Sequence, residues 1–199
     1  VSSGPAPADS VPVPSDSVPG DDDAGAVGVQ SISDDSGSIT VDVPAAWTEV
    51  RGEPDDELRQ LIAAPDVDAF FAGYSEPGVA ILAGDAPTGN GAEAASGALE
   101  GFQTAAETAG CSQNIAAPYD DGLYTGDELL YSCPGTASML HLAAGTNPTG
   151  DVVWLVAVVT PEGDDQSWTL VTESLFVGWR RGPSAGGRRR RPARGAERA

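Results

Sequence analysis

The sequence contains a single histidine, His141, which is the first side chain to test for acid–base or nucleophilic chemistry. It alternates with Leu140 and Leu142, a pattern typical of a β-strand. A nucleophilic site would also need a serine or cysteine beside the histidine and an acid to orient it. The chain has no G-x-S-x-G motif. We therefore interpret His141 as a structural residue of a strand and predict no catalytic residue.

Acidic side chains could act in pairs, as they do in glycosidases, or bind Ca²⁺. The chain has 30 Asp and Glu against 10 Lys and Arg, for a formal net charge of -20. Asp120, Asp121, Asp127 and Glu128 lie close together in sequence, but the EF-hand pattern is absent. We interpret these four as a solvated acidic loop and predict no specific metal site. Weak Ca²⁺ binding at the surface stays open.

The segment Gly89-Asn90-Gly91-Ala92-Glu93-Ala94 matches the spelling of a dinucleotide-binding fingerprint. Its context differs, because Asp85–Thr88 separates the glycines from the preceding strand and Glu93 would repel a pyrophosphate. We interpret the segment as the glycine-rich start of a helix and expect no cofactor.

Cys111 and Cys133 are the two cysteines of the chain. They do not form a C-x-x-C motif, which argues against redox catalysis. The first follows a predicted helix and the second ends a predicted strand, so they could meet at one end of a sheet. From the residues alone, a disulfide and two separate thiols are both open.

Aromatic and basic residues suggest two further binding surfaces. Four tryptophans could form a ligand platform, but core packing explains Trp47, Trp154 and Trp168 equally well. Trp179 is expected to be the most exposed.

All ten cations are Arg, and eight lie in residues 180–199. This segment could contact nucleic acid, but the acidic domain before it would repel phosphate, so we expect no nucleic-acid binding.

These residues must be positioned by an ordered region flanked by two tails. Residues 1–37 combine Ser, Pro, Gly and Asp without an aromatic or a cation, and we predict a disordered acidic stalk there. The Arg-rich residues 180–199 are predicted to be a second disordered tail. The globular domain is assigned to residues 38–179.

Hydrophobic periodicity within that domain predicts strands and helices in a defined order. Strands are expected at Ser38–Val43, Gly78–Ala83, Glu128–Cys133, Ala137–Ala144 and Val152–Val159, with Leu61–Ala64 as either a strand or the end of a helical turn. Helices are expected after Asp66, from Asn90 or Gly91 to Gly110, and after Asp164. The last three strands should form an antiparallel meander, with the apolar Val152–Val159 at the centre of the sheet. The fold class is therefore α+β, a mainly antiparallel sheet covered by helices.

The sequence resembles the extracytoplasmic PsbP-like domains of actinobacteria over about residues 38–178. The matching segments are ITVDVPAAW, IAAPDVDAFF, YSEPGVAILAG, AGCSQN, YTGDELLYSCPG and ESLFV. Such domains occur alone behind a membrane anchor or appended to membrane-bound proteins, including trypsin-like proteases. The resemblance implies an α/β/α sandwich, a location outside the cytoplasm and a Cys111–Cys133 disulfide.

We therefore expect a non-catalytic binding or accessory module of the cell envelope. The alternative is a part of a secreted or membrane-anchored hydrolase or serine protease whose catalytic part is absent from this chain. We expect a monomer that contacts an envelope protein or a small ligand. It would reach the membrane only through an anchor outside this chain.

Overall fold

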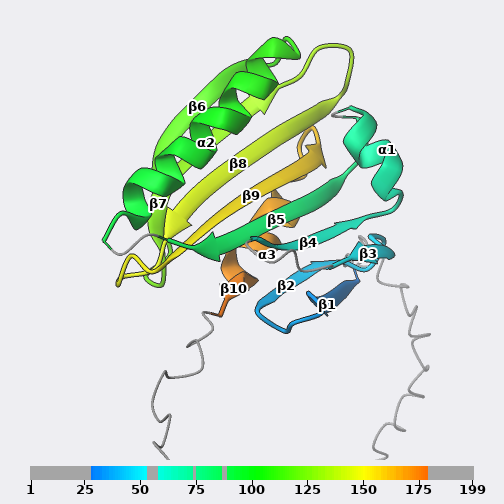
Figure 1. Ribbon diagram of the computed structural model, residues 1–199. Helices are drawn as coiled ribbons and strands as arrows, with labels where there is room; N and C mark the ends of the chain where they lie inside the picture. The colour runs from blue at the N-terminus through cyan, green and yellow to red at the C-terminus, as the bar shows by residue number, and fades with distance from the viewer. Residues whose placement is uncertain (1–27, 53–57, 74, 87–88, 179–199) are drawn as a thin grey trace, which may run out of the picture.

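A computed structural model describes residues 28–52, 58–73, 75–86 and 89–178. These residues form mixed α+β structure with antiparallel sheets, as the sequence predicts (Figure 1). The strands are β1 (Val29–Ser33), β2 (Ile39–Pro44), β3 (Glu49–Arg51), β4 (Leu58–Ala64), β5 (Gly78–Asp85), β6 (Ser112–Asp120), β7 (Thr125–Ser132), β8 (Ser138–Thr146), β9 (Val152–Pro161) and β10 (Phe176–Val177). The helices are α1 (Val67–Ala72), α2 (Gly91–Thr108) and α3 (Asp165–Ser174).

The larger sheet contains seven strands in the order β3-β4-β5-β9-β8-β7-β6. All its neighbouring strands pair antiparallel. The predicted meander is confirmed, since β7, β8 and β9 are consecutive neighbours. β9 lies at the centre of the sheet and is buried on both faces, which accounts for its continuous apolar sequence.

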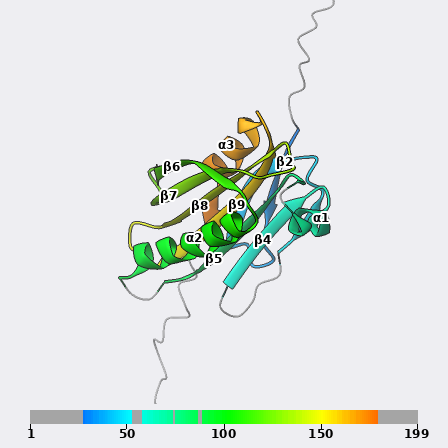
Figure 2. The ribbon, with the colours of Figure 1, turned by 90° about the horizontal axis from the view of Figure 1, so that it is seen from above.

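Three helices and a small second sheet cover the two faces of the larger sheet. α1 and α2 lie on one face, while α3 and the sheet β1-β2-β10 lie on the other (Figure 2). Each face therefore has its own hydrophobic core. The resulting layer order agrees with the predicted sheet covered by helices.

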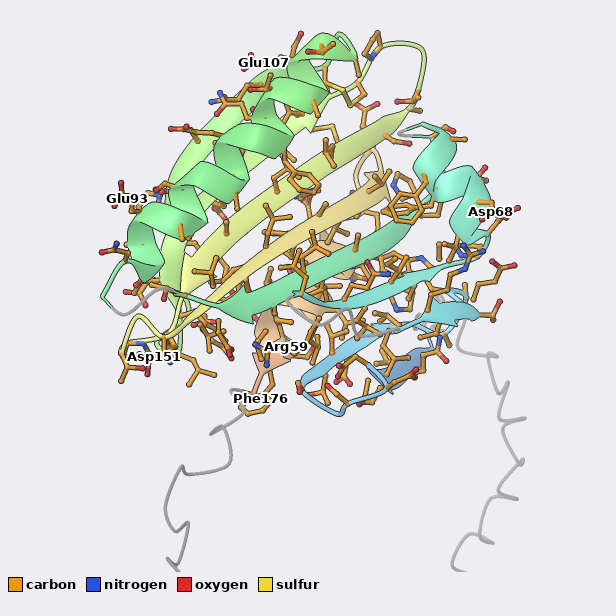
Figure 3. All side chains as sticks on the ribbon, viewed as in Figure 1. Arg59, Asp68, Glu93, Glu107, Asp151 and Phe176 are labelled. Atoms are coloured by element: carbon orange, nitrogen blue, oxygen red, sulfur yellow. A yellow bond between two sulfur atoms is a disulfide. The ribbon has the colours of Figure 1, made fainter. Side chains whose placement is uncertain are left out.

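Arg59 fixes the end of the described chain against the larger sheet. Its side chain is buried, and Nη1 donates a hydrogen bond of 2.6 Å to the Gly178 carbonyl oxygen. Nη2 lies 3.2 Å from Oδ1 of Asp85. Arg59 and Phe176 accordingly lie at the same end of the molecule (Figure 3). The contact holds β10 close to the larger sheet.

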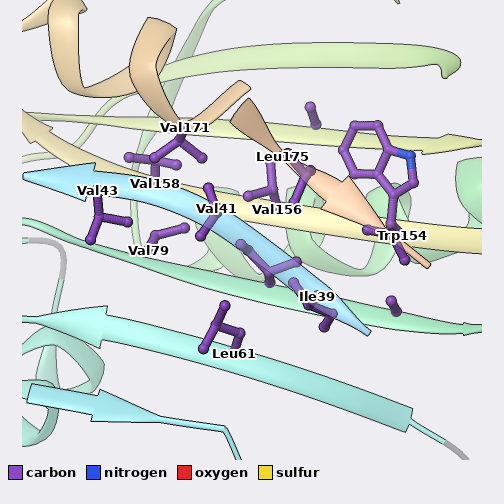
Figure 4. Close-up of a cluster of buried hydrophobic side chains, with 14 of the residues drawn as sticks. Ile39, Val41, Val43, Leu61, Val79, Trp154, Val156, Val158, Val171 and Leu175 are labelled. Atoms are coloured by element: carbon purple, nitrogen blue, oxygen red, sulfur yellow. The ribbon is translucent and has the colours of Figure 1, made fainter. Parts of the chain in front are cut away.

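The core under α3 is built mainly from β-branched residues. Ile39, Val41 and Val43 alternate inward from β2, in the segment where the sequence predicts a strand. They meet Val156 and Val158 of β9 in a continuous cluster (Figure 4). Val171 of α3 and Leu175 just after it are buried, and Trp168 packs against the same cluster.

The predicted stalk boundary at residue 37 is wrong. β1 lies within the predicted stalk and pairs antiparallel with β2, placing Ile32 against the core. Oδ1 of Asp34 accepts a hydrogen bond of 2.7 Å from the Ile39 amide. β1 buries little of its own surface, so it is held by backbone pairing that its composition does not reveal. The rest of the predicted stalk, the Arg-rich tail and Trp179 lie outside the described residues.

β6 forms one edge of the larger sheet and was not predicted. Most of its side chains are exposed, so its sequence has no clear alternation of apolar and polar residues. Its pairing with β7 shifts register between Gln113 and Ile115, and Pro118 lies in its second half. β6 is therefore an irregular edge strand.

Candidate functional site

A largely apolar pocket of about 510 Å³ lies between α1 and α2 on one face of the larger sheet. The α1 side contributes Phe70, Phe71, Ala72, Gly73 and Ser75. The sheet contributes Ala80, Leu140, Leu142, Ala157 and Val159. The α2 side and the loop between β7 and β8 contribute Phe102, Ala109, Cys133, Pro134 and Thr136. The pocket is thus assembled from segments distant in sequence.

Small side chains on two neighbouring strands create the hollow in the pocket floor. Ala80 of β5 lies directly opposite Ala157 of β9 in the antiparallel register. The next inward-facing pair along these strands, Leu82 and Leu155, carries larger side chains and lies beyond the pocket lining. The methyl groups of the two alanines extend less far from the sheet than the side chains of the two leucines. The pocket floor is therefore lower over the alanine pair than over the leucine pair.

α1 forms one wall and is held in place at its first turn. Asp66 caps the helix, accepting a hydrogen bond of 2.9 Å from the Ala69 amide, as the sequence predicts. Oε2 of Glu49 accepts another from the Val67 amide at 3.1 Å. These contacts join the start of α1 to its own cap and to β3.

The two phenylalanines of α1 lie differently. Phe70 packs onto the sheet because Gly78 has no side chain; a Cβ there would lie 2.7 Å from Cδ2 of Phe70. Phe71 is 60 % exposed, and the ring centroids are 5.1 Å apart in an edge-on arrangement. Phe70 therefore closes one end of the pocket, and Phe71 stands at its rim.

The opposite wall is fixed by a disulfide between Cys111 and Cys133. This pairing confirms the one that the family resemblance implied. The disulfide joins the segment after α2 to the end of β7, next to the lining residues Ala109 and Pro134. Phe102 projects from α2 and keeps 36 % of its surface exposed. It therefore lines the pocket rather than packing fully into the core.

The pocket has no charged residue among the described residues that line it. Its polar side chains are the hydroxyls of Ser75 and Thr136, and the Thr136 hydroxyl donates to the Cys133 carbonyl oxygen at 3.1 Å. On the surrounding surface, Glu107 lies at the end of α2, and Asp68 on α1 forms an ion pair with Arg51 of β3 at 2.9 Å (Figure 3). The pocket can therefore accept an apolar group, and its described lining residues supply no charged acid, base or metal ligand.

His141 lies on the opposite face of the sheet from this pocket. Its ring stacks on Trp168 with centroids 4.9 Å apart, and Nε2 lies 3.3 Å from the Thr160 hydroxyl. Burial lowers the pKa of His141, while the charges of Asp165 and Asp164 act in the opposite direction. Thr160 is its only hydrogen-bond partner among the described residues. The surroundings of His141 thus lack the arrangement of a nucleophilic site.

The acidic residues 120–128 are only partly in a loop. Asp120 and Asp121 stabilise the turn between β6 and β7, accepting hydrogen bonds from the amides of Gly122, Leu123 and Tyr124. Asp127 and Glu128 lie in β7, which corrects the prediction of one acidic loop. Burial raises the pKa of Glu128. Within the described ranges, no group of three His, Cys, Asp or Glu side chains could hold a metal ion.

The glycine-rich segment begins α2, as predicted from the sequence. Gly91 lies so close to the β8–β9 loop that a Cβ would be 2.7 Å from the Gly150 carbonyl oxygen. The preceding strand, β5, pairs antiparallel with both of its neighbours. The segment therefore lacks the parallel β-α-β setting of a dinucleotide site.

The remaining aromatic residues and the comparisons do not identify another site. Trp47 and Trp154 are buried in the core, and Trp168 packs against it. No helix among the described residues is long and apolar enough to span a bilayer. No family model matches the chain, and no curated protein matches it.

Sequence reasoning missed the pocket itself. One available signal was the Phe70-Phe71 pair, because adjacent residues point about 100° apart on a helix and a six-residue helix with one side on the core leaves the second ring near its margin. The pairing of Ala80 with Ala157 left no signal, because it depends on the register of two strands far apart in sequence.

Proposed function

We propose that this chain is a non-catalytic, extracytoplasmic binding module of the cell envelope with a PsbP-like fold. Its binding site would be the pocket between α1 and α2. The observation that carries the proposal is an open apolar pocket on a rigid sheet, without a charged group among its described lining residues. Preformed apolar hollows of ~300–1,000 Å³ are typical of small-molecule sites.

The chemistry around the pocket favours binding over catalysis. Ser75 and Thr136 could act as nucleophiles only with a base beside them. The sole histidine of the chain faces the other side of the sheet, against Trp168. Asp68 and Glu107 lie outside the lining. A bound molecule would therefore be held without being activated.

The disulfide supports a location outside the cytoplasm. Disulfides persist in oxidising compartments and are rare where thiols are kept reduced. This is compatible with the resemblance of residues 38–178 to envelope domains. The partner proposed for this pocket is an apolar small molecule, either free or attached to an envelope component.

Titration of the full chain with the uncharged dye Nile red tests the proposed binding. We expect a saturable rise in fluorescence with a shift to shorter wavelength, because the dye would leave water for an apolar pocket. Ala157→Leu should reduce this signal at least tenfold by filling the floor. Ala92→Leu, at an exposed position in the first turn of α2, adds the same atoms away from the lining residues Phe102 and Ala109 and should bind like the parent chain. A signal that is absent, or equal in the parent and Ala157→Leu chains, would contradict the proposal.

A further inference from the structure

We infer that the pocket takes a compact, uncharged ring system of one or two fused rings rather than a long alkyl chain. This inference rests on the proposed function, because it specifies the ligand of the same site. It depends on the shape of the floor, the charge of the surroundings and the aromatic residues at the rim.

The floor is short along the strands and wide across them. It consists of two rows of side chains: Leu140 with Val159, and Leu142 with Ala157 and Ala80. Two rows on three adjacent strands span about 7 Å along the strands and about 10 Å across them, from the ordinary side-chain and strand spacings.

Larger side chains border this short floor on two sides. The Leu82 and Leu155 pair forms the next row at one end. Phe70 lies over Gly78, which pairs with Val159, and so covers the β5 side of the first row. A long chain lying along the strands would meet the Leu82 and Leu155 pair, whereas a flat ring system of one or two rings fits beside Phe70.

The charge distribution excludes ionic ligands of either sign from the interior. Among the described residues, those that line the pocket carry no charge, so a buried ion would lose its hydration without gaining a partner. Glu107 at the end of α2 would also repel an anion as it approached, whereas the charge of Asp68 on α1 is paired with Arg51 at 2.9 Å. An uncharged molecule meets neither this loss of hydration nor this repulsion.

The aromatic residues favour a ring over an alkyl chain of equal size. Phe70 and Phe71 already pack edge to face, and Phe102 lines the same pocket. Aromatic pairs gain stability from such arrangements beyond the apolar area that they bury. Dry apolar cavities in proteins are known to take up benzene, which shows that a compact apolar ring can bind without a polar contact.

Three small probes, each with about ten carbon atoms, test the inference with the full chain. Naphthalene is compact and uncharged, 1-decanol is an uncharged chain, and naphthalene-2-sulfonate is a charged ring. Binding is followed by the NMR shifts of the methyl groups of Leu140, Leu142 and Val159, which lie in the floor. We expect naphthalene to shift these methyl signals saturably, with each of the other two probes at least tenfold weaker.

Variants then show whether the binding occurs at this floor. Ala157→Leu should weaken naphthalene binding at least tenfold, while Ala92→Leu, outside the lining, should leave it unchanged. Ala80→Leu, which fills the same hollow from β5, serves as the second variant if Ala157→Leu does not fold. A thermal unfolding midpoint no lower than that of the parent chain shows that a filled variant is intact.

The outcomes separate the ligand class from the proposed function. If 1-decanol or the sulfonate shifts the floor methyl signals as tightly as naphthalene, the compact uncharged ring is wrong and the binding module stands. If naphthalene binds equally well to the filled variants, it binds elsewhere and the inference is overturned. If neither Nile red nor any of the three probes shifts these signals, the proposed function fails as well.

Discussion

Removing the Cys111–Cys133 disulfide should destabilise the domain by about 3 kcal/mol. The two cysteines are 22 residues apart in sequence. For a loop of this length, the chain-entropy relation gives a stabilisation of about 3 kcal/mol at 25 °C, because the cross-link restricts the unfolded chain. At roughly 2–4 °C per kcal/mol for a domain of this size, the unfolding midpoint should fall by about 6–12 °C.

The measurement compares two ways of removing the bond in the full chain. One is the double substitution Cys111→Ala/Cys133→Ala, and the other is chemical reduction of the parent protein. Urea unfolding followed by circular dichroism gives the free energy of unfolding and its dependence on denaturant. That dependence should become steeper in both samples, because an unfolded chain without the cross-link exposes more surface. Reduction keeps both sulfur atoms, so a difference between the two samples reports how well the buried sulfurs pack.

A loss below about 1 kcal/mol with an unchanged denaturant dependence would refute this reasoning. It would mean that the cross-link does not restrict the unfolded chain. Nile red titration of the reduced protein adds a functional readout, since Cys133 and Pro134 line the pocket wall. We expect weaker dye binding once the end of α2 is no longer tied to β7.

Three further outcomes follow from other parts of the structure. The free energy of unfolding should decrease between pH 7 and pH 5, because burial lowers the pKa of His141 in the folded state and the unfolded chain therefore takes up the proton first. Urea titrations should find this decrease flattened in His141→Gln, and an unchanged slope would contradict the assignment. Gly126→Ala should lower the free energy of unfolding, measured in urea, by about 1–3 kcal/mol, because its Cβ would overlap the Ala144 carbonyl oxygen and lie 2.6 Å from Cα of Gly145. A change in this free energy within error of zero would show that the strands separate easily there. The thermal midpoint of the full chain should rise between 0.01 M and 0.1 M NaCl, as the Debye length falls from about 30 Å to about 10 Å and repulsion within the charge of -20 is screened. A flat response in differential scanning calorimetry would indicate that the carboxylates are too far apart to repel.

The elements with strong periodicity could be predicted from sequence. α2 begins at Gly91 and is followed by Gly110 with φ +86°, the left-handed conformation expected just after a helix. β9 could be placed at the centre because it is apolar on both faces. These features follow from each segment's own residues.

The missed elements depend on pairing between distant segments. β1 and β6 expose most of their side chains, so their hydrogen-bonded neighbours define them better than their own sequences do. The pocket depends on the same kind of information. Ala80 and Ala157 are ordinary small residues in two apolar strands, and a hollow forms only because the register places them side by side.

The irregular edge strand β6 has a consequence for how copies of this protein behave at high concentration. An open edge of nine residues offers backbone groups that could add strands from a second molecule and start an aggregate. The register shift at Gln113–Ile115 interrupts the hydrogen-bonding pattern, and a proline in an edge strand leaves the open side without an N–H at Pro118. Between these two interruptions the regular edge extends only over Ile115–Ala117, which is too short for a long intermolecular ladder. The residues that obscured β6 in the sequence thus discourage a folded molecule from recruiting another through this edge.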